Sequence, residues 1–345
     1  MRKTKVLAGI GFGAVALLAL AGCGQVGGGT GGGESGGGSS EGGAMVTVVK
    51  ISGVGWFDRM EVGVNEFAEE TGIDARQEGA DDASPEKQIQ IIQDLIAQSP
   101  AAITVVPNSP EALESVLKQA RDQGIVVVAH EAAGIKNADI DIEAFDNRAY
   151  GAQIMDNLAE CMGETGQYVS FVGGLTAKTH MYWVGGAYDQ QQAEYPELTR
   201  VEEPVESKED ENVAYQRAKE LLAKYPDLAG FQGSAGTDVA GIARAVQEAG
   251  LEDQVCVMGT SIPSVAKKYI VDGSIDKIFF WDPAMAGKAQ LKIAQLLVDG
   301  EEITDGTDLG IEGYTSLTKL EGFDNVFVGD AAVIVDKDNV DEYDF

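Results

Sequence analysis

Residues 45–60 read MVTVVKISGVGWFDRM, and this stretch decides how the rest of the chain is interpreted. A run of β-branched and apolar residues, typical of a buried strand, ends at Lys50. A loop with two glycines follows, and the adjacent aromatics Trp56 and Phe57 stand where a helix begins. Because an unpaired lysine is rarely buried, we expect the core to end at Lys50 and the next residues to border a cleft.

The same order of strand and helix repeats along the chain. Apolar runs at residues 102–106, 125–129 and 168–172 alternate with stretches whose apolar residues recur every three or four positions. Two helices are expected to open at Ser84-Pro85-Glu86 and Ser109-Pro110-Glu111, where a capping serine precedes a proline. The pattern predicts an α/β fold of two Rossmann-like, doubly wound lobes with buried parallel strands.

Composition divides the chain further. The acidic, irregular residues 139–148 are the expected crossing from one lobe to the next. In chain order we expect a lipoprotein signal peptide at residues 1–23 and a tether at 24–44. A first lobe should follow at 45–147 and a second lobe at 148–280. Residues 281–345 should return to the first lobe and include a hinge crossing and the C-terminal segment.

The N-terminus is typical of an exported protein. Basic residues precede an apolar stretch that closes on Leu20-Ala21-Gly22-Cys23, which resembles a lipobox whose Cys23 is acylated. The alternative is an uncleaved membrane anchor with an incidental cysteine. Glycine and serine dominate residues 24–44 and favour a flexible tether. We therefore expect an extracytoplasmic protein, anchored by lipid to the cell membrane, at the outer face of the cytoplasmic membrane or in the periplasm.

The chain is strongly acidic, with 56 acidic and 25 basic residues and a net charge of −31. Such a charge repels nucleic acid and anionic lipid surfaces, so no nucleic-acid partner is expected. An acidic surface suited to salty surroundings would explain it, because salt screens the self-repulsion. A field that guides a charged ligand is the alternative.

Cysteine and histidine are scarce. With Cys23 assigned to the anchor, Cys161 at a helix end and Cys256 in a strand are expected to be two separate buried thiols and not a disulfide. His130 and His180 are the only histidines, and they show no metal-binding spacing. We expect neither a metal nor another cofactor.

The residues that end the predicted strands are strongly polar. Ligands of open parallel sheets bind beyond the carboxyl ends of the strands. These ends are Lys50, Asn108, His130-Glu131, Gly173-Gly174, the stretch from Ser234 to Asp238, Thr260-Ser261 and Trp281-Asp282. Three tryptophans, Trp56, Trp183 and Trp281, accompany them, although an aromatic residue is more often part of a core. Aromatic faces stacked on a polyhydroxylated ring would explain all three.

No catalytic residue is expected. Residues 172–179 approach a phosphate-binding loop, but Val172 and Ala177 stand where that motif needs glycine. The sequence also has no nucleophile elbow and no zinc signature. Glu131 and Asp282 would be glycosidase carboxylates only in a groove that cleaves its substrate.

From Val46 to Phe345 the chain resembles the type I periplasmic binding proteins of ABC sugar importers, and within them the branch of autoinducer-2 and rhamnose receptors. The stretches that carry the resemblance are Lys50-x-x-Gly53-Val54-Gly55-Trp56-Phe57, the helix from Gln88 to Gln98, Trp281-Asp282-x-x-x-x-Gly287-Lys288 and the terminal Tyr343-Asp344-Phe345. The resemblance implies two lobes joined by three hinge crossings. It also implies that a helix from Ala284 to Asp299 returns to the first lobe.

The resemblance further implies a ligand site drawn from both lobes. Lys50 matches the ligand-contacting lysine of autoinducer-2 receptors, whereas the first-lobe aspartate of the family is Glu131 here. The family's aspartate–glutamine pair falls on Thr179-His180, and its second-lobe proline and alanine fall on Ser234 and Gly236. The expected ligand-binding residues are Lys50, Trp56, Phe57, Asn108, Glu131, Thr179, His180, Trp183, Ser234, Gly236, Asp238, Trp281 and Asp282. Because the hydrogen-bonding groups differ, autoinducer-2 is only one candidate ligand.

We therefore expect a monomeric solute-binding protein that captures a sugar or polyol, of rhamnose, pentose or autoinducer-2 type, and delivers it to an ABC permease and its ATPase. The alternatives are an exported carbohydrate-active enzyme and a sugar sensor that presents its ligand to a membrane receptor. A transcriptional repressor with the same core would need a helix-turn-helix before Met45, where this sequence has the lipobox and the tether.

The lipobox makes the first testable prediction. Cys23→Ser removes the acylated thiol, so the protein should move from the membrane fraction into the medium or periplasm. Fractionation followed by carbonate washing measures this, and an unchanged membrane share in the variant would contradict the lipid anchor.

Overall fold

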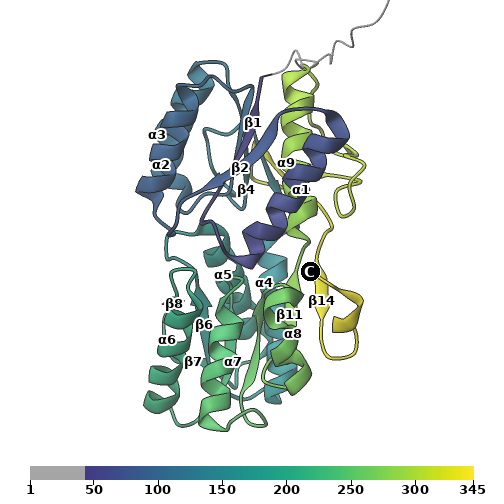
Figure 1. Cartoon of the computed structure of the whole chain (residues 1–345). Coiled ribbons are helices and arrows are strands. Elements are labelled where there is room, and N and C mark those ends of the chain that lie inside the picture. Colours follow the sequence, from purple (N-terminus) through teal and green to yellow (C-terminus); the bar gives the residue numbers. More distant parts are fainter. Residues whose placement is uncertain (1–42) are drawn as a thin grey trace, which may run out of the picture. The chain divides into compact units, whose positions relative to one another are not determined.

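The computed structural model describes residues 43–345, which fall within one compact unit. The predicted signal peptide, Cys23 and nearly all of the predicted tether lie outside the described residues. Residues 43–345 form two α/β lobes, each built on a seven-stranded sheet (Figure 1). The predicted fold class is confirmed.

The sheet of the first lobe is parallel except at one edge, where β12 runs antiparallel to β13. Its strands in spatial order are β12 (Thr318–Lys319), β13 (Val326–Val328), β5 (Ile140–Glu143), β4 (Val126–His130), β3 (Ala102–Val105), β1 (Met45–Val49) and β2 (Ala75–Gly79). Helices cover both of its faces: α1 (Gly55–Thr71), α2 (Pro85–Ile96), α3 (Pro110–Asp122) and α9 (Pro283–Val298).

The alternation of side chains along β1 explains why this strand is buried on both faces. Val46 and Val48 pack with the apolar residues of α2 and α3, whereas Met45 and Val49 pack with those of α1 and α9. Thr47 is also fully buried, and its hydroxyl accepts a hydrogen bond from the Thr104 hydroxyl at 2.8 Å.

The second lobe repeats this architecture. Its strands in spatial order are β14 (Val333–Val335), β11 (Lys277–Phe280), β10 (Cys256–Thr260), β9 (Leu228–Gly233), β6 (Gly166–Val172) and β7 (Leu198–Arg200), and the short β8 (Val205–Glu206) also pairs with β6. Its helices are α4 (Asn147–Met162), α5 (Lys178–Glu194), α6 (Glu211–Lys224), α7 (Asp238–Ala249) and α8 (Pro263–Asp272), and a 3₁₀ turn spans Val340–Glu342.

Local chemistry fixes several helix positions. Ser84 and Ser109 cap α2 and α3 as predicted, each accepting a hydrogen bond from a backbone N–H three residues later. The helix expected from the family resemblance is α9, and it packs tightly on α1. At their crossing the Cα of Gly63 faces the carbonyl of Ala284, and a Cβ there would lie 1.9 Å from that oxygen. Only glycine permits this approach.

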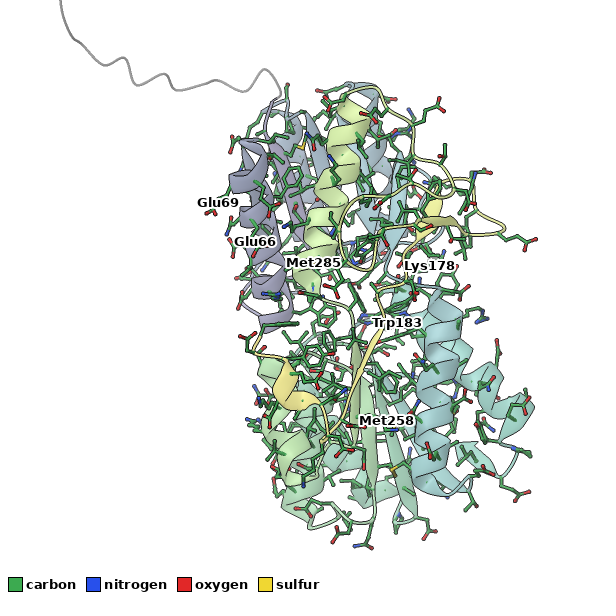
Figure 2. All side chains as sticks on the ribbon, turned by 90° about the vertical axis from the view of Figure 1, so that its right-hand side faces the viewer. Glu66, Glu69, Lys178, Trp183, Met258 and Met285 are labelled. Atoms are coloured by element: carbon green, nitrogen blue, oxygen red, sulfur yellow. A yellow bond between two sulfur atoms is a disulfide. The ribbon has the colours of Figure 1, made fainter. Side chains whose placement is uncertain are left out.

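Many charged side chains project from the outside of both lobes. Figure 2 shows Glu66 and Glu69 pointing away from α1, whereas Trp183 lies at the junction of the two lobes. Among residues 43–345 no helix is both long enough and apolar enough to cross a membrane.

The chain passes between the lobes three times. The crossings are residues 144–146, between β5 and α4, residues 281–282, between β11 and α9, and residues 329–332, between β13 and β14. The first and third are hydrogen-bonded together, because the N–H groups of Gly329 and Ala331 donate to the carbonyls of Glu143 and Ala144 at 2.9 and 3.1 Å. Phe145 in the first crossing packs edge-on against Trp281 in the second, with 5.3 Å between ring centroids, so the three crossings are in contact.

The first crossing is shorter than the acidic, irregular segment that we expected at residues 139–148. Ile140–Glu143 is β5, which lies between β4 and β13 inside the sheet. Asp141 and Glu143 are buried, and one carboxylate oxygen of Glu143 accepts hydrogen bonds from the N–H groups of Ala132 and Ala133. Acidic residues are rare in buried strands, so the composition concealed this one.

The expectation of two separate thiols was wrong. Cys161 and Cys256 form a disulfide, with their Cα atoms 6.1 Å apart. The sequence placed one cysteine at a helix end and the other in a strand, and both placements hold. It did not show that the C-terminal end of α4 lies beside the start of β10. Among the described residues, the only side chains at metal-binding spacing are these two cysteines and Asp276, and the disulfide removes both thiols.

This disulfide leads to a stability prediction. Cys161→Ala with Cys256→Ala should lower the free energy of unfolding by about 2–4 kcal/mol, because the bond closes a loop with a sequence separation of 95. Urea unfolding with and without reductant measures the change, and the double variant, which has no bond to break, is the control. A wild-type unfolding curve that does not respond to full reduction would contradict the prediction.

Candidate ligand-binding site

The carboxyl ends of the two sheets meet at a cavity between the lobes. Lys50 follows β1 and Glu131 follows β4 in the first lobe, while His180 and Trp183 lie on α5 and residues 234–237 follow β9 in the second. The cavity encloses about 30 Å³, room for about one or two water molecules. A larger ligand can enter only if the lobes separate or side chains rearrange.

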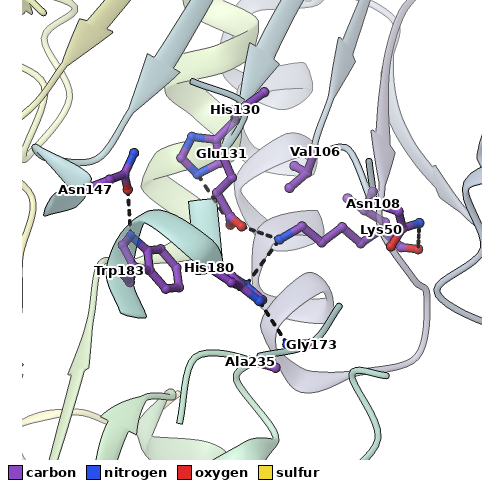
Figure 3. A network of polar contacts seen from close by, with 12 residues as sticks. Lys50, Val106, Asn108, His130, Glu131, Asn147, Gly173, His180, Trp183 and Ala235 are labelled. Atoms are coloured by element: carbon purple, nitrogen blue, oxygen red, sulfur yellow. Dashed lines mark hydrogen bonds and ion pairs between the residues drawn. The ribbon is translucent and has the colours of Figure 1, made fainter. Parts of the chain in front are cut away.

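Lys50 and Glu131 form an ion pair at the centre of this cavity (Figure 3). Each side chain is only 4% exposed. Burial acts to lower the pKa of Lys50, but the charges of Glu131 and Glu209 raise it above its ordinary value, so the ammonium stays protonated. Glu131 has a φ of +55°, a left-handed conformation that costs about 1–3 kcal/mol for a residue with a Cβ.

Two amide side chains hold the end of β1. The Nδ2 of Asn108 donates to the carbonyl of Lys50 at 2.9 Å. The Nε2 of Gln88 donates to the carbonyls of Val49 and Val106 at 3.2 and 2.8 Å, and its Oε1 accepts from the N–H of Asn108 at 2.9 Å. Gln88 and Asn108 therefore fix the backbone from which the Lys50 side chain projects into the cavity.

His180 faces the ion pair from the second lobe. Its Nδ1 accepts a hydrogen bond from the N–H of Gly173 at 3.1 Å, so in the neutral ring the proton sits on Nε2. Burial and the charge of Lys50 lower the pKa of His180 well below its ordinary value, which keeps the ring neutral. Nε2 lies 3.5 Å from the Lys50 ammonium, so two donors face each other, and an acceptor oxygen between them would satisfy both.

Three tryptophans form the apolar side of the cavity. Trp281 packs edge-on against Trp56, with 4.6 Å between ring centroids, and against Trp183 at 5.7 Å. Two of the indole N–H groups are hydrogen-bonded: Trp183 donates to Asn147 at 2.6 Å and Trp281 to Nε2 of His130 at 3.2 Å. The indole faces are thus oriented by hydrogen bonds outside the cavity.

The loop after β9 supplies hydroxyl groups. Asp238 holds this loop, because its Oδ2 accepts from the N–H groups of Ser234 and Ala235 at 3.0 and 2.8 Å. Burial raises the pKa of Asp238 to about 6. The hydroxyl oxygens of Ser234 and Thr237 are buried without a hydrogen-bond partner in the described part of the chain. Such groups are costly unless a ligand or water completes them.

Many of the predicted site residues line the cavity. They are Lys50, Trp56, Phe57, Glu131, His180, Trp183, Ser234, Gly236 and Trp281. Asn108, Thr179, Asp238 and Asp282 do not line it. Asn108 and Asp238 position neighbouring groups, and Asp282 instead caps α9 and forms a two-pronged ion pair with Arg59 at 2.6 and 2.8 Å. The hydroxyl of Thr179 is buried and has no partner among the described residues.

Two lining residues had not been singled out. Glu209 lies between β8 and α6, and Val265 lies on α8. Neither follows a long apolar strand, which was the signal used to find the others. An acidic residue in a polar segment looks the same in sequence whether it faces the cleft or the solvent.

A wider cleft of about 820 Å³ leads to the cavity and shares Val54, Glu209 and Thr237 with it. Its lining is strongly acidic. The acidic residues are Asp81, Asp82, Glu86, Glu206, Glu209, Asp210 and Glu211, against a single basic lining residue, Lys208.

Two parallel-sheet lobes that close a polar, aromatic-walled cavity at a three-part hinge are the architecture of a two-lobed solute-binding protein. The family comparison agrees with this. Residues 45–302 match the model of the periplasmic binding protein domain, and the chain belongs to that family.

Individual relatives are more distant. The chain is 25% identical over 267 residues to the D-allose-binding periplasmic protein of Escherichia coli K12, covering 74% of this chain and 84% of that protein. It is also 25% identical over 202 residues to the D-ribose/D-allose-binding protein of Pseudomonas aeruginosa, covering 56% of this chain and 62% of that protein.

Solved structures share the fold. An ABC transporter solute-binding protein of Clostridium phytofermentas with bound L-rhamnose gives a TM-score of 0.80 at 21% identity, covering 88% of this chain and 98% of that one. LsrB of Clostridium saccharobutylicum in complex with AI-2 gives a TM-score of 0.80 at 20% identity, covering 88% and 100%. At these identities the likeness concerns the fold.

The ion pair makes a stability prediction. Lys50→Met strands the buried Glu131 carboxylate and should lower the free energy of unfolding by about 3–5 kcal/mol near pH 7.5.

Urea unfolding at neutral pH measures this effect. Lys87→Met removes an exposed lysine that pairs with Asp81 and Asp82, and it is the matched control, expected to change stability little. Adding Glu131→Gln to Lys50→Met should restore part of the loss. A deficit of the same size in the exposed control, or one that Glu131→Gln does not reduce, would contradict the prediction.

Proposed function

We propose that this chain is an extracytoplasmic solute-binding protein that captures a sugar or sugar-like polyol between its lobes and delivers it to an ABC transporter permease. The observation that carries the proposal is the combination of uncommitted polar groups with aromatic faces in one hinge cavity. Membership of the periplasmic binding protein domain family supports it.

The polar groups suit a polyol. A hydroxyl group both donates and accepts, so one ligand oxygen can take hydrogen bonds from Lys50 and His180 while its proton goes to a carboxylate. The free hydroxyl oxygens of Ser234 and Thr237 extend this pattern into the second lobe. Aromatic rings can cover the apolar faces of a sugar ring, a role open to Trp56 and Trp183.

The compounds named for the similar proteins indicate which class of ligand to test. Names and complexes of the similar proteins mention D-allose, D-ribose, L-rhamnose and AI-2. These compounds are small, neutral and rich in hydroxyl groups. Their spread is consistent with a ligand of the same kind for this chain, with AI-2 as one candidate.

The two carboxylates that the sequence offered for glycoside cleavage, Glu131 and Asp282, do not form a catalytic pair. Glu131 is committed to Lys50, and Asp282 is committed to Arg59 and to the N–H of Ala284 at 2.9 Å. A glycosidase needs two carboxyl groups that flank the scissile bond. Asp282 does not line the cavity, so this pair does not meet that requirement.

The cellular setting is part of the same proposal. Acylation of Cys23 would hold the protein at the membrane beside the permease. The glycine-rich tether would let the two lobes reach the permease, and the protein would act as a monomer. The ATPase on the opposite face would then drive import.

A ligand screen tests the function. D-allose, D-ribose, L-rhamnose and AI-2 are added separately to the protein, and a true ligand at 100 times its dissociation constant should stabilise it by about 2.7 kcal/mol. Calorimetric titration then gives the affinity. If no sugar or polyol stabilises the protein or releases heat, the proposal is wrong.

Ser234→Ala tests whether binding uses this cavity. Loss of one hydrogen bond of about 0.5–1.5 kcal/mol should weaken the best ligand roughly two- to tenfold. Ser316→Ala, at an exposed serine outside the cavity lining, is the control and should leave affinity unchanged. Equal affinities of both variants and the wild type would place binding elsewhere.

A further inference from the structure

Glu209 reaches the cavity from a segment that belongs to neither sheet. It lies between β8 and α6, next to Asp210, which caps α6. Lys208 and Glu209 have φ values of +61° and +58°, two successive left-handed conformations without glycine. Each costs about 1–3 kcal/mol, and such strain is typical of positions held for function.

Gly173, at the end of β6, makes room for this side chain. A Cβ on Gly173 would lie 2.1 Å from a carboxylate oxygen of Glu209. The backbone turn and the bare Cα of Gly173 together direct the carboxylate into the cavity, where it lies among the lining groups.

The charges around Glu209 do not balance. Lys50 already has an ion pair with Glu131, and within residues 43–345 Glu209 has neither a salt bridge nor a side-chain hydrogen bond. His180 on α5 is neutral, and Asp238 on α7 adds negative charge. On its own segment Glu209 stands between Lys208 and Asp210. The cavity therefore holds one more carboxylate than it holds cations.

We propose that Glu209 selects the ligand by charge, so that the site accepts neutral sugars and rejects those that carry a carboxylate. The proposal rests on the proposed function and names the residue that sets its substrate class. A second carboxylate brought into this small cavity beside the half-buried Glu209 would be repelled, because the cavity holds little water to screen the two charges. The acidic cleft that leads to the cavity acts in the same direction.

Acidity provides an independent test of this role. Burial, followed by the charges of Asp238 and Glu131, raises the pKa of Glu209 to about 7, although Lys50 acts to lower it. Glu209 thus gains its charge as the pH rises through neutrality, while a sugar acid with an ordinary carboxyl pKa is ionised throughout. Rejection of acidic sugars should grow over this range.

The experiment compares neutral sugars with matched acids. D-allose, D-ribose, L-rhamnose and D-galactose are titrated between about pH 5.5 and 8. Each is compared with its uronic acid, the sugar acid in which the last carbon of the chain is a carboxylate. For the wild type, any neutral sugar that binds should exceed its acid in affinity, and the ratio should rise with pH. At pH 8 the Glu209→Gln variant should lower this ratio by about tenfold and flatten its pH dependence.

Controls separate Glu209 from its neighbours. Glu86→Gln removes a carboxylate that lines only the wider cleft, and it should change the ratio less than about threefold. Asp238 and Glu143, whose pKa values are raised to about 6 and about 7, are present in both proteins, so the part of the pH dependence that Glu209→Gln removes reports Glu209 and its coupling to Asp238.

The outcomes are distinct. A sugar acid that binds the wild type as tightly as its neutral parent, or a ratio that Glu209→Gln leaves unchanged, overturns the charge selection while sugar binding stands. Binding of none of the sugars by a folded protein overturns the proposed function, and the selection with it. Circular dichroism confirms folding of each variant.

Discussion

The ammonium group of Lys50 is charged and buried away from bulk water, and several residues of the cleft stabilise or position it. Without partners it would cost several kcal/mol to bury. Glu131 supplies the direct ion partner in a left-handed backbone conformation, and Gln88 and Asn108 hold the strand end from which the lysine projects. Glu209 adds a second carboxylate, and Lys50 is the only cation among the described residues that line the cavity. The carboxylates that stabilise the lysine therefore also leave the ligand cavity with an excess of negative charge.

The ion pair is also connected to the hinge. His130, next to Glu131, donates from Nδ1 to the carbonyl of Ile142 on β5 at 2.5 Å and accepts from Trp281 in the second crossing at 3.2 Å. Burial lowers the pKa of His130, so the ring stays neutral and keeps this donor–acceptor pattern. Asp282, beside Trp281, ties α1 to the same crossing through Arg59. Rotation of one lobe on the other would thus move residues that are bonded directly to the site.

Strand-end reasoning found most of the cavity because parallel strands in a doubly wound sheet all deliver their carboxyl ends to one edge. It worked for Lys50, Glu131 and Ser234, each of which follows a parallel strand. It missed Glu209, whose approach depends on two left-handed residues and on the bare Cα of Gly173 from another element. It included Asp282, which follows a strand but points to Arg59 and the end of α9 instead of the cavity.

The sequence by itself determined the α/β class, the two lobes and the capped starts of α2 and α3, because these depend on local periodicity and on capping chemistry within a few residues. The disulfide between Cys161 and Cys256, the burial of Asp141 and Glu143 in β5 and the position of Glu209 were decided only by tertiary structure. Each depends on which distant backbone lies alongside, and a buried carboxylate or a paired cysteine has the same local sequence as an exposed one.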